Sequence, residues 1–245
     1  MVEGDILTKG NTASIYLANE KVYKIYEERL PNEESYKEAR KQKFARSTGL
    51  NVPEVLDVTE INGRQALVME YVQGESFGDL LLEDKMPVYE LMKVSVEIQR
   101  DIHKRDAEGL DRMDEKLLFQ ISNAPYLHEK RKTILINRMN NIIGAYQLCH
   151  GDFHLFNLIW TKHNPAIIDW VDASAGDPLA DVCRSYLLYL QFSKDLAEIY
   201  LNIFTQGSGV EVESVLAWMP ILAAARLSEH VSSDNKEHLI QLAYE

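Results

Sequence analysis

The pattern of apolar and polar positions changes once along the chain. Within residues 6–26 and 54–72, apolar and polar positions alternate in short runs, which is typical of strands with one buried face. From residue 76 onward, apolar residues recur at steps of three and four, as in amphipathic helices. The sequence therefore predicts a strand-rich part followed by a helix-rich part, with the change near residue 73.

Two pairs of residues predict tight turns between strands. Asn19 with Glu20, and Asn62 with Gly63, each separate two alternating runs, and two-residue connections of this kind favour hairpins. Between the two hairpins, the stretch that starts at Asn32 carries acidic residues first and basic residues later, which is the order that the helix dipole prefers. We therefore expect a helix there, with Asn32 as its N-cap.

The helical periodicity continues to the end of the chain. Pro87 and Pro178 each precede an apolar stripe, and proline is favoured at the start of a helix. The expected helices cover residues 87–102, 114–122, 127–143, 178–192, 212–227 and 235–244, and a further helix after residue 192 ends at Gly207 and Gly209.

The composition is that of a globular protein. Hydrophobic residues make up 46% of the 245 residues and charged residues 26%, which is sufficient for two lobes that each bury a core. The formal net charge of -12 disfavours a nucleic-acid partner, because such a partner requires a basic surface. This acidity is compatible with a cationic small molecule, and equally with solubility alone.

Cysteine usage and hydropathy indicate a cytoplasmic protein. Cys149 and Cys183 lie among apolar neighbours and fit no metal-binding spacing, so we interpret them as reduced core thiols. The first residues lack the basic and apolar pattern of a signal peptide. The longest uncharged apolar run, residues 215–225, is too short to span a bilayer and contains Pro220, so no membrane segment is expected.

Three hard oxygen donors occur at fixed offsets in the second half of the chain. Asp152 and Asn157 lie on one apolar run and Asp169 on the next, with a polar turn at residues 161–165 that allows the runs to pair as a hairpin. Two carboxylates and an amide suit Mg2+, which binds a few protein oxygens together with substrate phosphates. Phosphoryl transfer uses such a trio, in which one acid orients the acceptor hydroxyl and the other two groups hold metal.

Taken singly, these residues have ordinary structural interpretations. Asp152 and Asn157 could form turns or cap a helix, and Asp169 could end a strand. Their joint spacing favours the functional interpretation, because short apolar runs rarely deliver three such groups by chance. We interpret His150 and His154 as structural histidines, since acceptor chemistry of this kind requires no imidazole.

The first part of the chain offers candidate phosphate-binding groups. Residues 8–14 form a small polar loop between strands, which could either cover a triphosphate or be a surface turn. Lys24 lies in a strand and is either a solvated lysine or one that binds nucleotide phosphates, steadied by a glutamate on a helix. Glu34 and Glu38, one helical turn apart on the same face, are the two candidates for that glutamate.

The order His-x-Asp-x-x-x-x-Asn, followed by an Asp after a strand, resembles the catalytic loop and metal-binding Asp of kinases. Gly151 stands where protein kinases have Arg, and Trp170 follows Asp169 where they have Phe-Gly. With the Gly-Asp-Pro-Leu-Ala-Asp run at residues 176–181, these motifs resemble the aminoglycoside phosphotransferase family, which also includes choline-kinase-like enzymes. The matching motifs extend from about residue 10 to residue 181.

The resemblance implies an α+β fold of the bilobal protein-kinase-like type, with a small antiparallel-sheet N-lobe and a larger, mainly helical C-lobe. Residues 1–72 would form the nucleotide-binding lobe, and residues 73–245 the catalytic and acceptor-binding lobe. The implied cofactors are ATP and Mg2+, and the implied partner is a small molecule with a hydroxyl group. The order of strands and helices along the chain agrees with this fold.

The resemblance also assigns roles residue by residue. It selects Glu38 rather than Glu34 as the partner of Lys24, and it implies that Asp177 and Asp181 brace the catalytic loop, although Asp177 could instead cap a helix. The implied catalytic residues are Asp152, Lys24 and Glu38; the nucleotide-binding residues are Gly10, Asn11, Thr12, Ala13, Ser14, Lys24, Glu70 and Val72; the metal ligands are Asn157 and Asp169.

The sequence therefore predicts an ATP- and Mg-dependent phosphotransferase that moves the γ-phosphoryl group to a hydroxyl of a small molecule, such as an aminoglycoside, an amino alcohol like choline or a sugar-like metabolite. The alternative is a catalytically weak, nucleotide-binding regulatory protein of the same fold. Acids of the C-terminal helices could receive a cationic acceptor or could simply be surface residues. They are Asp195, Glu198, Glu211, Glu213, Glu229, Asp234 and Glu237.

Overall fold

The computed structural model describes residues 5–10, 12–162, 164–229, 231 and 234–245, which fold into two compact units. One unit consists of Met1–Glu83 with Phe156–Asp172, and the other of Asp84–Leu155 with Ala173–Glu245. The hairpin segment after Leu155 thus joins the first unit, whereas the sequence suggested a single division after residue 72. The assignment of nucleotide binding to one lobe and catalysis to the other stays a prediction.

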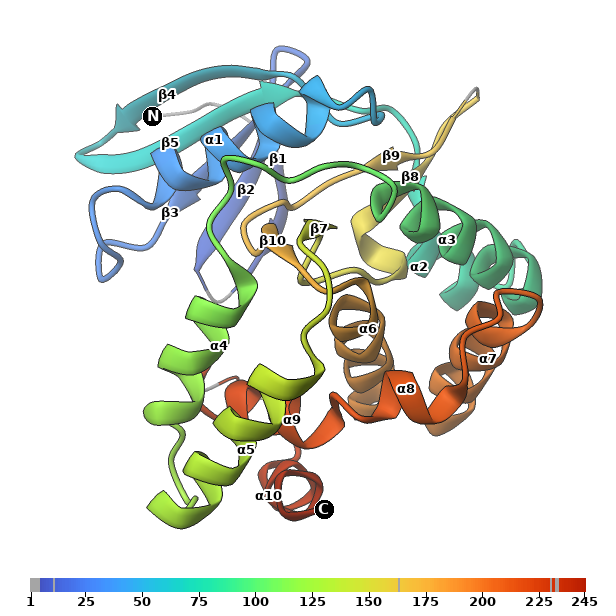
Figure 1. Ribbon diagram of the computed structural model, residues 1–245. Helices are drawn as coiled ribbons and strands as arrows, with labels where there is room; N and C mark the ends of the chain where they lie inside the picture. Colours follow the sequence, from blue (N-terminus) through green and yellow to red (C-terminus); the bar gives the residue numbers. More distant parts are fainter. Residues whose placement is uncertain (1–4, 11, 163, 230, 232–233) are drawn as a thin grey trace. The chain divides into compact units, whose positions relative to one another are not determined.

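The first unit contains a five-stranded antiparallel sheet (Figure 1). Its strands are β1 (Asp5–Lys9), β2 (Ala13–Ala18), β3 (Lys21–Tyr26), β4 (Val55–Ile61) and β5 (Arg64–Glu70), in the order β1-β2-β3-β5-β4. Asn19 and Glu20 join β2 to β3 with φ values of 50° and 57°, and Asn62 and Gly63 join β4 to β5 with φ values of 53° and 76°. Both hairpin turns predicted from the sequence are confirmed.

Helix α1 (Glu34–Ser47) covers one face of this sheet (Figure 1). A core cluster joins them, made of Ala13, Tyr26, Ala39, Val55, Leu67 and Met69. The prediction that Asn32 caps this helix is wrong. Asn32 lies inside a turn in which the Glu34 N–H donates to the Pro31 carbonyl, so the helix begins after Glu33 without a side-chain cap.

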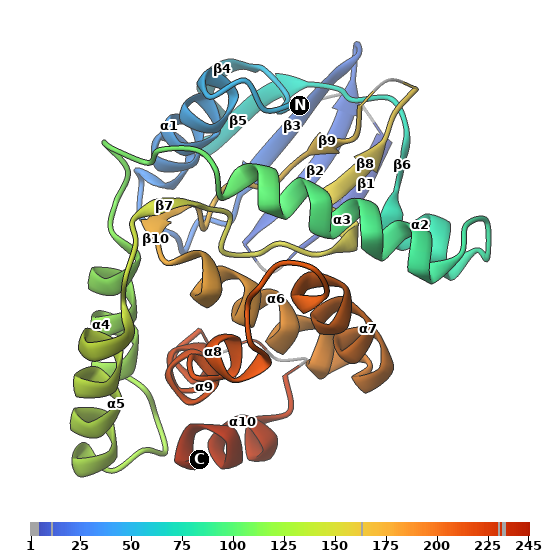
Figure 2. The ribbon, with the colours of Figure 1, turned by 45° about the vertical axis from the view of Figure 1, so that its right-hand side comes forward.

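A second, three-stranded sheet completes the first unit (Figure 2). It contains β6 (Glu75–Ser76), β8 (Leu158–Trp160) and β9 (Ala166–Ile167) in the order β6-β8-β9, and α2 (Phe77–Leu82) follows β6. The predicted hairpin of the two apolar runs is confirmed by the antiparallel pairing of β8 with β9. His163, part of the polar segment predicted to join the two runs, lies outside the described residues.

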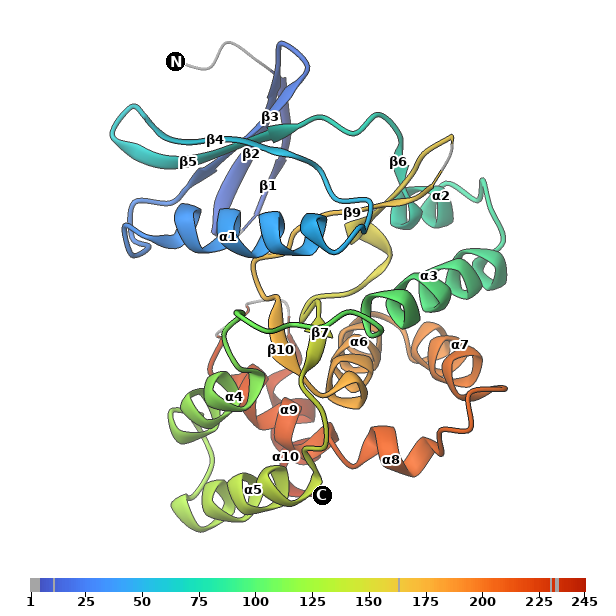
Figure 3. The same ribbon diagram turned by 45° about the horizontal axis from the view of Figure 1, so that its top comes forward.

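The second unit is mainly helical (Figure 3). Its helices are α3 (Val88–Ile102), α4 (Met113–Ser122), α5 (Glu129–Ile142), α6 (Pro178–Phe192), α7 (Lys194–Thr205), α8 (Val212–Leu216), α9 (Met219–Leu227) and α10 (Lys236–Tyr244). This unit also contains a two-stranded sheet. Its strands are β7 (Gln147–Cys149), which follows α5, and β10 (Ser174–Gly176), which precedes α6. The α+β fold class predicted from the sequence is confirmed.

One predicted helix is divided in two. The sequence predicted a continuous helix over residues 212–227, but α8 ends at Leu216 and α9 starts at Met219. Pro220 lies in the first turn of α9, where its missing N–H costs nothing, whereas in a continuous helix it would interrupt a hydrogen bond. None of the helices in the described part of the chain has the length and apolar character that a membrane crossing requires.

Gly74, just before β6, provides a test of this packing. A Cβ at Gly74 would lie 2.1 Å from the Trp160 carbonyl oxygen, whereas a Cβ at Gly63 would meet nothing within 4 Å. We expect Gly74→Ala to lower the free energy of unfolding by about 2 kcal/mol or more, because the β6–β8 pair must move apart. Gly63→Ala should cost only the backbone strain of its positive φ, about 1 kcal/mol. Urea unfolding with equal midpoints for the two variants would contradict this.

Candidate active site

A buried lysine of the first unit lies between two carboxylates. Lys24 Nζ donates to Glu38 Oε1 and to Asp169 Oδ1, each at 2.8 Å. Lys24 is 7% exposed and Glu38 1%, while the Asp169 side chain is 37% exposed. Glu34 instead pairs with Lys37 at 3.1 Å. Of the two candidate glutamates, it is therefore Glu38 that contacts Lys24.

The electrostatics of this cluster follow from its burial. Burial alone would lower the pKa of Lys24, but the neighbouring carboxylates of Asp169 and Glu38 hold that pKa above its ordinary value. Burial raises the pKa of Glu38, and the positive charge of Lys24 acts against that rise. Lys24 therefore keeps its positive charge across the physiological pH range, in a position where it can neutralise anionic groups.

The backbone around Asp169 is held in an uncommon conformation. Asp169 has a φ of 62°, in the left-handed region that Asp tolerates better than most residues. The next residue, Trp170, is fully buried and its indole Nε1–H donates to the Ile167 carbonyl at 3.1 Å. Lys41 of α1 donates to the Val171 carbonyl at 2.7 Å. Contacts on both sides thus maintain a strained backbone at a candidate functional residue.

Asn157 and Asp169 lie at the same end of the β8–β9 pair. Leu158 pairs with Ile167, and the Ile168 N–H donates to the Asn157 carbonyl at 3.0 Å, so the two segments are still bonded at this point. The oxygen donors that the sequence assigned to a metal therefore come from neighbouring strand ends of one unit. A carboxylate that is partly exposed and a nearby amide fit the oxygen ligands that Mg2+ prefers.

The loop between β1 and β2 is held by backbone hydrogen bonds. The Gly10 N–H donates to the Ala13 carbonyl at 2.9 Å, and the Glu27 N–H, just after β3, donates to the Thr12 carbonyl at 2.8 Å. Ala13 and Ser14 already belong to β2 and are buried. Asn11, also assigned to the nucleotide, lies outside the described residues.

The segment expected to meet adenine begins where β5 ends. The Glu70 N–H donates to the Glu54 carbonyl at 2.9 Å, and the Glu70 carboxylate accepts from the Glu54 N–H at 3.1 Å. These bonds hold the end of β5 against the chain before β4. Val72 follows two residues later, between β5 and β6, and is half-buried. Binding of the purine by the backbone of Glu70 and Val72 stays a prediction.

Asp152 belongs to the second unit, where His154 and Arg184 act on its carboxylate. His154 Nε2 lies 3.4 Å from Asp152 Oδ2. Burial alone would raise the pKa of Asp152, but the hydrogen bond from His154 and the positive charge of Arg184 hold it below its ordinary range. Asp152 is therefore ionised at neutral pH, and its carboxylate can accept a hydrogen bond from a hydroxyl group.

A second buried carboxylate braces the loop that carries Asp152. Asp181, 1% exposed, accepts from the Gly151 N–H at 2.7 Å, from Gln99 Nε2 at 3.1 Å, and lies 2.9 Å from His103 Nε2. Gly151 has a φ of 82°, which explains a glycine at this position. The bracing role that the resemblance implied for Asp181 is therefore present in the structure.

Asp177 takes the alternative role. Its carboxylate caps α6 by accepting from the Leu179 N–H at 2.8 Å, and its other oxygen accepts from the Gly144 N–H at 2.9 Å. Neither bond reaches the loop of residues 150–157. Capping explains Asp177, and the bracing of this loop is left to Asp181.

His103, Cys149 and Asp181 form a buried group whose potential ligand atoms lie within 4.8 Å of one another. Burial raises the pKa of the Cys149 thiol well above its ordinary value, so this thiol stays protonated and is a poor metal ligand. The oxygens of Asp181 are already used by hydrogen-bond donors of the loop. We interpret this group as structural.

The comparisons with known proteins agree with this geometry. A model of the phosphotransferase enzyme family matches residues 6–219. The chain belongs to this family. The resemblance inferred from the motifs is thereby confirmed.

Solved structures show the same fold. An aminoglycoside phosphotransferase APH(4)-Ia, in a ternary complex with ADP and hygromycin B, superposes with a TM-score of 0.73 at 16% identity, over 99% of this chain and 92% of that one. Choline kinase LicA from Streptococcus pneumoniae gives a TM-score of 0.64 at 15% identity, over 97% and 92% of the two chains. The predicted kinase-like fold is confirmed by these similarities.

A curated relative matches a shorter region. The KEOPS complex subunit Bud32 of Pyrococcus abyssi is 38% identical over 82 residues, which is 34% of this chain and 36% of the relative. The chain therefore spans about a third of the length of that relative.

Sequence reasoning missed three side chains that support the site of this family member. Tyr26 donates to Glu38 Oε2 at 2.6 Å, Lys41 binds the segment after Asp169, and His103 contacts Asp181. For the first two a signal existed. Tyr26 lies two residues after Lys24 and thus on the same face of β3, and Lys41 lies three residues after Glu38 on α1. His103 could be found only from the tertiary structure.

The hydrogen bonds of Asp181 lead to a prediction about stability. The pKa of Asp181 is lowered, chiefly by His103 acting against burial, so the unfolded chain takes up this proton at a higher pH than the folded one. The stabilisation is complete above about pH 5 and is lost as the pH falls through the folded-state pKa. We expect Asp181→Asn to cost about 2–3 kcal/mol at neutral pH and less in acid. Chemical unfolding between pH 3 and 7 measures both; a variant with the wild-type pH slope would contradict this account.

Proposed function

We propose that the protein is an ATP-dependent phosphotransferase that transfers the γ-phosphoryl group of ATP to a hydroxyl group of a small molecule. The observation that carries this proposal is the cluster of Lys24, Glu38 and Asp169, in a chain that belongs to the phosphotransferase enzyme family. A buried, permanently charged lysine beside a partly exposed carboxylate suits the binding of a nucleotide with its metal. The complexes of similar structures with ADP and ATP support this choice of nucleotide.

In this proposal the first unit binds ATP. Lys24 neutralises phosphate oxygens and is kept in place by Glu38. The loop of residues 10–14 and the segment of Glu70 and Val72 contact the triphosphate and the purine. Asn157 and Asp169 would hold Mg2+, which when bound neutralises charge on the phosphate oxygens.

Asp152 would orient the acceptor. Its carboxylate accepts a hydrogen bond from the acceptor hydroxyl and takes up the proton as the hydroxyl oxygen forms a bond to the γ-phosphorus. The bond from that phosphorus to the bridging oxygen breaks, and ADP leaves with the bonding electrons. The lowered pKa of Asp152 makes it a weak base, which is acceptable because the transition state of phosphoryl transfer is loose and depends mainly on positioning.

Arg184, which acts on Asp152, belongs to a set of paired charges in the second unit. Arg184 and Arg226 both donate to Glu229, and Arg226 also pairs with Asp234. Two of the acids that could have received a cationic acceptor are thus already paired with arginines. These two acids are therefore occupied by arginines, and the pairing does not select among an amino alcohol, a sugar-like metabolite and an aminoglycoside as the acceptor.

Two isosteric variants test the division of roles. Asp152→Asn and Asp169→Asn should each lower the rate of phosphoryl transfer by about a thousandfold or more, because one removes the proton acceptor and the other a metal ligand. Only Asp169→Asn should weaken the binding of ATP in the presence of Mg2+. The measurements are ATP turnover with a panel of amino alcohols, sugars, nucleosides and aminoglycosides, and calorimetric ATP titrations with and without Mg2+.

The wild-type protein serves as the reference in both assays. Equal losses of ATP affinity in the two variants would refute the separate roles. Tight binding of ATP by the wild-type protein with no turnover on any acceptor would instead indicate a nucleotide-binding regulatory protein.

A further inference from the structure

The carboxylate of Glu38 has two oxygens, and Lys24 binds only one of them. Oε1 accepts from Lys24 Nζ at 2.8 Å, whereas Oε2 accepts from the Tyr26 hydroxyl at 2.6 Å. Because Glu38 is almost inaccessible to water, solvent cannot replace a donor that is lost at Oε2. The orientation of this carboxylate therefore depends on both residues of β3.

The Tyr26 ring is fixed by packing. It belongs to the core cluster between the five-stranded sheet and α1, together with Ala39, the residue that follows Glu38. Burial raises the pKa of the Tyr26 hydroxyl far above its ordinary value, so this group keeps its proton and donates at any physiological pH. A buried aromatic ring has few accessible rotamers, so its hydroxyl is held in place before any ligand binds.

Tyr26 also contacts the other parts of the nucleotide site. Lys24 Nζ lies 5.8 Å from the centroid of the Tyr26 ring, a distance at which a cation is attracted to an aromatic face. Tyr26 pairs with Ala13 across β2 and β3, directly after the loop assigned to the triphosphate. A single side chain and its backbone thus meet the lysine, the glutamate and the strand that follows the loop.

We propose that Tyr26 is a positioning residue of the nucleotide site, which holds Glu38 in the orientation that presents Lys24 to the phosphates of ATP. This inference rests on the proposed function. Without the hydroxyl, Glu38 Oε2 is left without its donor in a dry environment, so the carboxylate either takes up a proton or turns away. Lys24 is then held mainly by Asp169, the carboxylate assigned to the metal.

This role has a signature in the pH dependence of ATP binding. The groups that face Glu38 are Lys24 and Tyr26 from β3 and Asp169 from the segment after β9, and Glu34 on α1 adds a negative charge near Tyr26. Burial raises the pKa of Glu38, while the hydrogen bonds from Lys24 and Tyr26 lower it. Loss of the Tyr26 bond raises this pKa further, so the variant should lose ATP affinity at a higher pH than the wild type as the pH falls.

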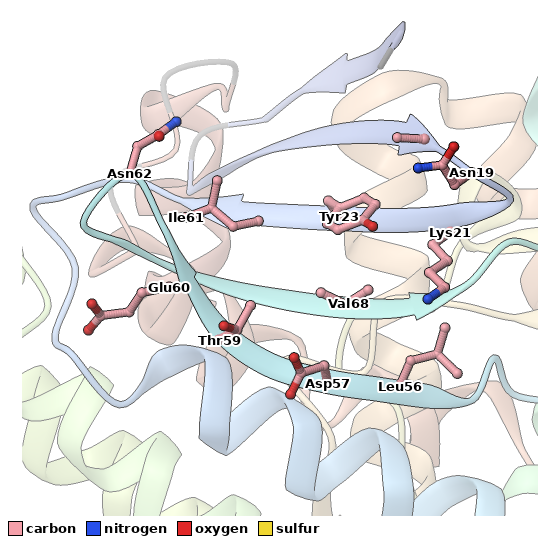
Figure 4. Close-up of a pocket in the computed structure, with 11 residues that line it drawn as sticks. Asn19, Lys21, Tyr23, Leu56, Asp57, Thr59, Glu60, Ile61, Asn62 and Val68 are labelled. Atoms are coloured by element: carbon pink, nitrogen blue, oxygen red, sulfur yellow. The ribbon is translucent and has the colours of Figure 1, made fainter. Parts of the chain in front are cut away.

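The test is Tyr26→Phe, which removes one oxygen atom and keeps the ring. We expect the dissociation constant of ATP with Mg2+, measured by calorimetry, to rise about tenfold or more, as is usual when a partner that orients a ligand-binding group is lost. Tyr23→Phe is the matched control. Tyr23 lies on the same strand but lines a hollow of about 940 Å³ on the opposite face of the sheet, with Val68 and Thr59 (Figure 4). It should bind ATP as the wild type does.

A double-mutant cycle with Glu38→Gln shows whether Tyr26 acts through Glu38. Tyr26→Phe should have little further effect on ATP binding in the Glu38→Gln background, and thermal unfolding of each variant without ATP reports any loss of folding separately. Equal ATP affinities of Tyr26→Phe and Tyr23→Phe, or an undiminished effect in the Glu38→Gln background, overturn the inference alone. A wild-type protein that does not bind ATP overturns the proposed function, and this inference with it.

Discussion

The buried ammonium group of Lys24 is the interaction on which the first unit depends. A charge that is nearly excluded from water must be matched by opposite charge, and here Glu38 and Asp169 supply it from positions 14 and 145 residues away in the sequence. Three separate pieces of chain, β3, α1 and the segment after β9, must therefore come together for the lysine to be buried. Removing either carboxylate leaves a positive charge with incomplete compensation, so the contacts of the proposed nucleotide site also stabilise the fold of this unit.

Helix α1 is the platform for this arrangement. Its inner face carries Glu38 toward Lys24, Lys41 toward the Val171 carbonyl, and Gln42 toward the Pro53 carbonyl. The second unit uses a comparable device, because Asp181 collects donors from Gly151 and Gln99 around one buried carboxylate. In the first unit the buried Lys24 holds the segment of Asp169 by a side-chain hydrogen bond. In the second unit the buried Asp181 holds the backbone of Gly151, next to Asp152.

The local features of the fold could be predicted from the sequence because their causes are local. The turn at Asn62 and Gly63 requires positive φ, and Pro178 favours the first turn of a helix, so both positions followed from the chemistry of single residues. The break between α8 and α9 was missed although Pro220 marks it. The apolar periodicity alone predicts a continuous helix, whereas in the structure the missing N–H of Pro220 is accommodated by a new helix start.

Some residues of the candidate site could likewise be predicted from local sequence, and others depend on tertiary packing. The spacing of Asp152, Asn157 and Asp169 predicts the two acids and the amide as candidates, since each lies on or next to a short apolar run; their catalytic and metal-binding roles stay predictions. The choice between Glu34 and Glu38 could not be made from periodicity, because both lie on one face of the helix and only packing determines which reaches Lys24. Tyr26 was missed because a buried tyrosine in a strand is normally explained by its ring alone.

The two thiols of this chain have a practical consequence. Cys149 and Cys183 are completely buried, and burial raises the pKa of both, so neither presents a thiolate to a reagent in solution. An alkylating fluorophore should therefore leave the native protein unlabelled, and a cysteine introduced on the surface of each unit would become the reactive position. Changes in fluorescence energy transfer between two such dyes could then report how the units respond to a nucleotide, in a protein that keeps its own cysteines.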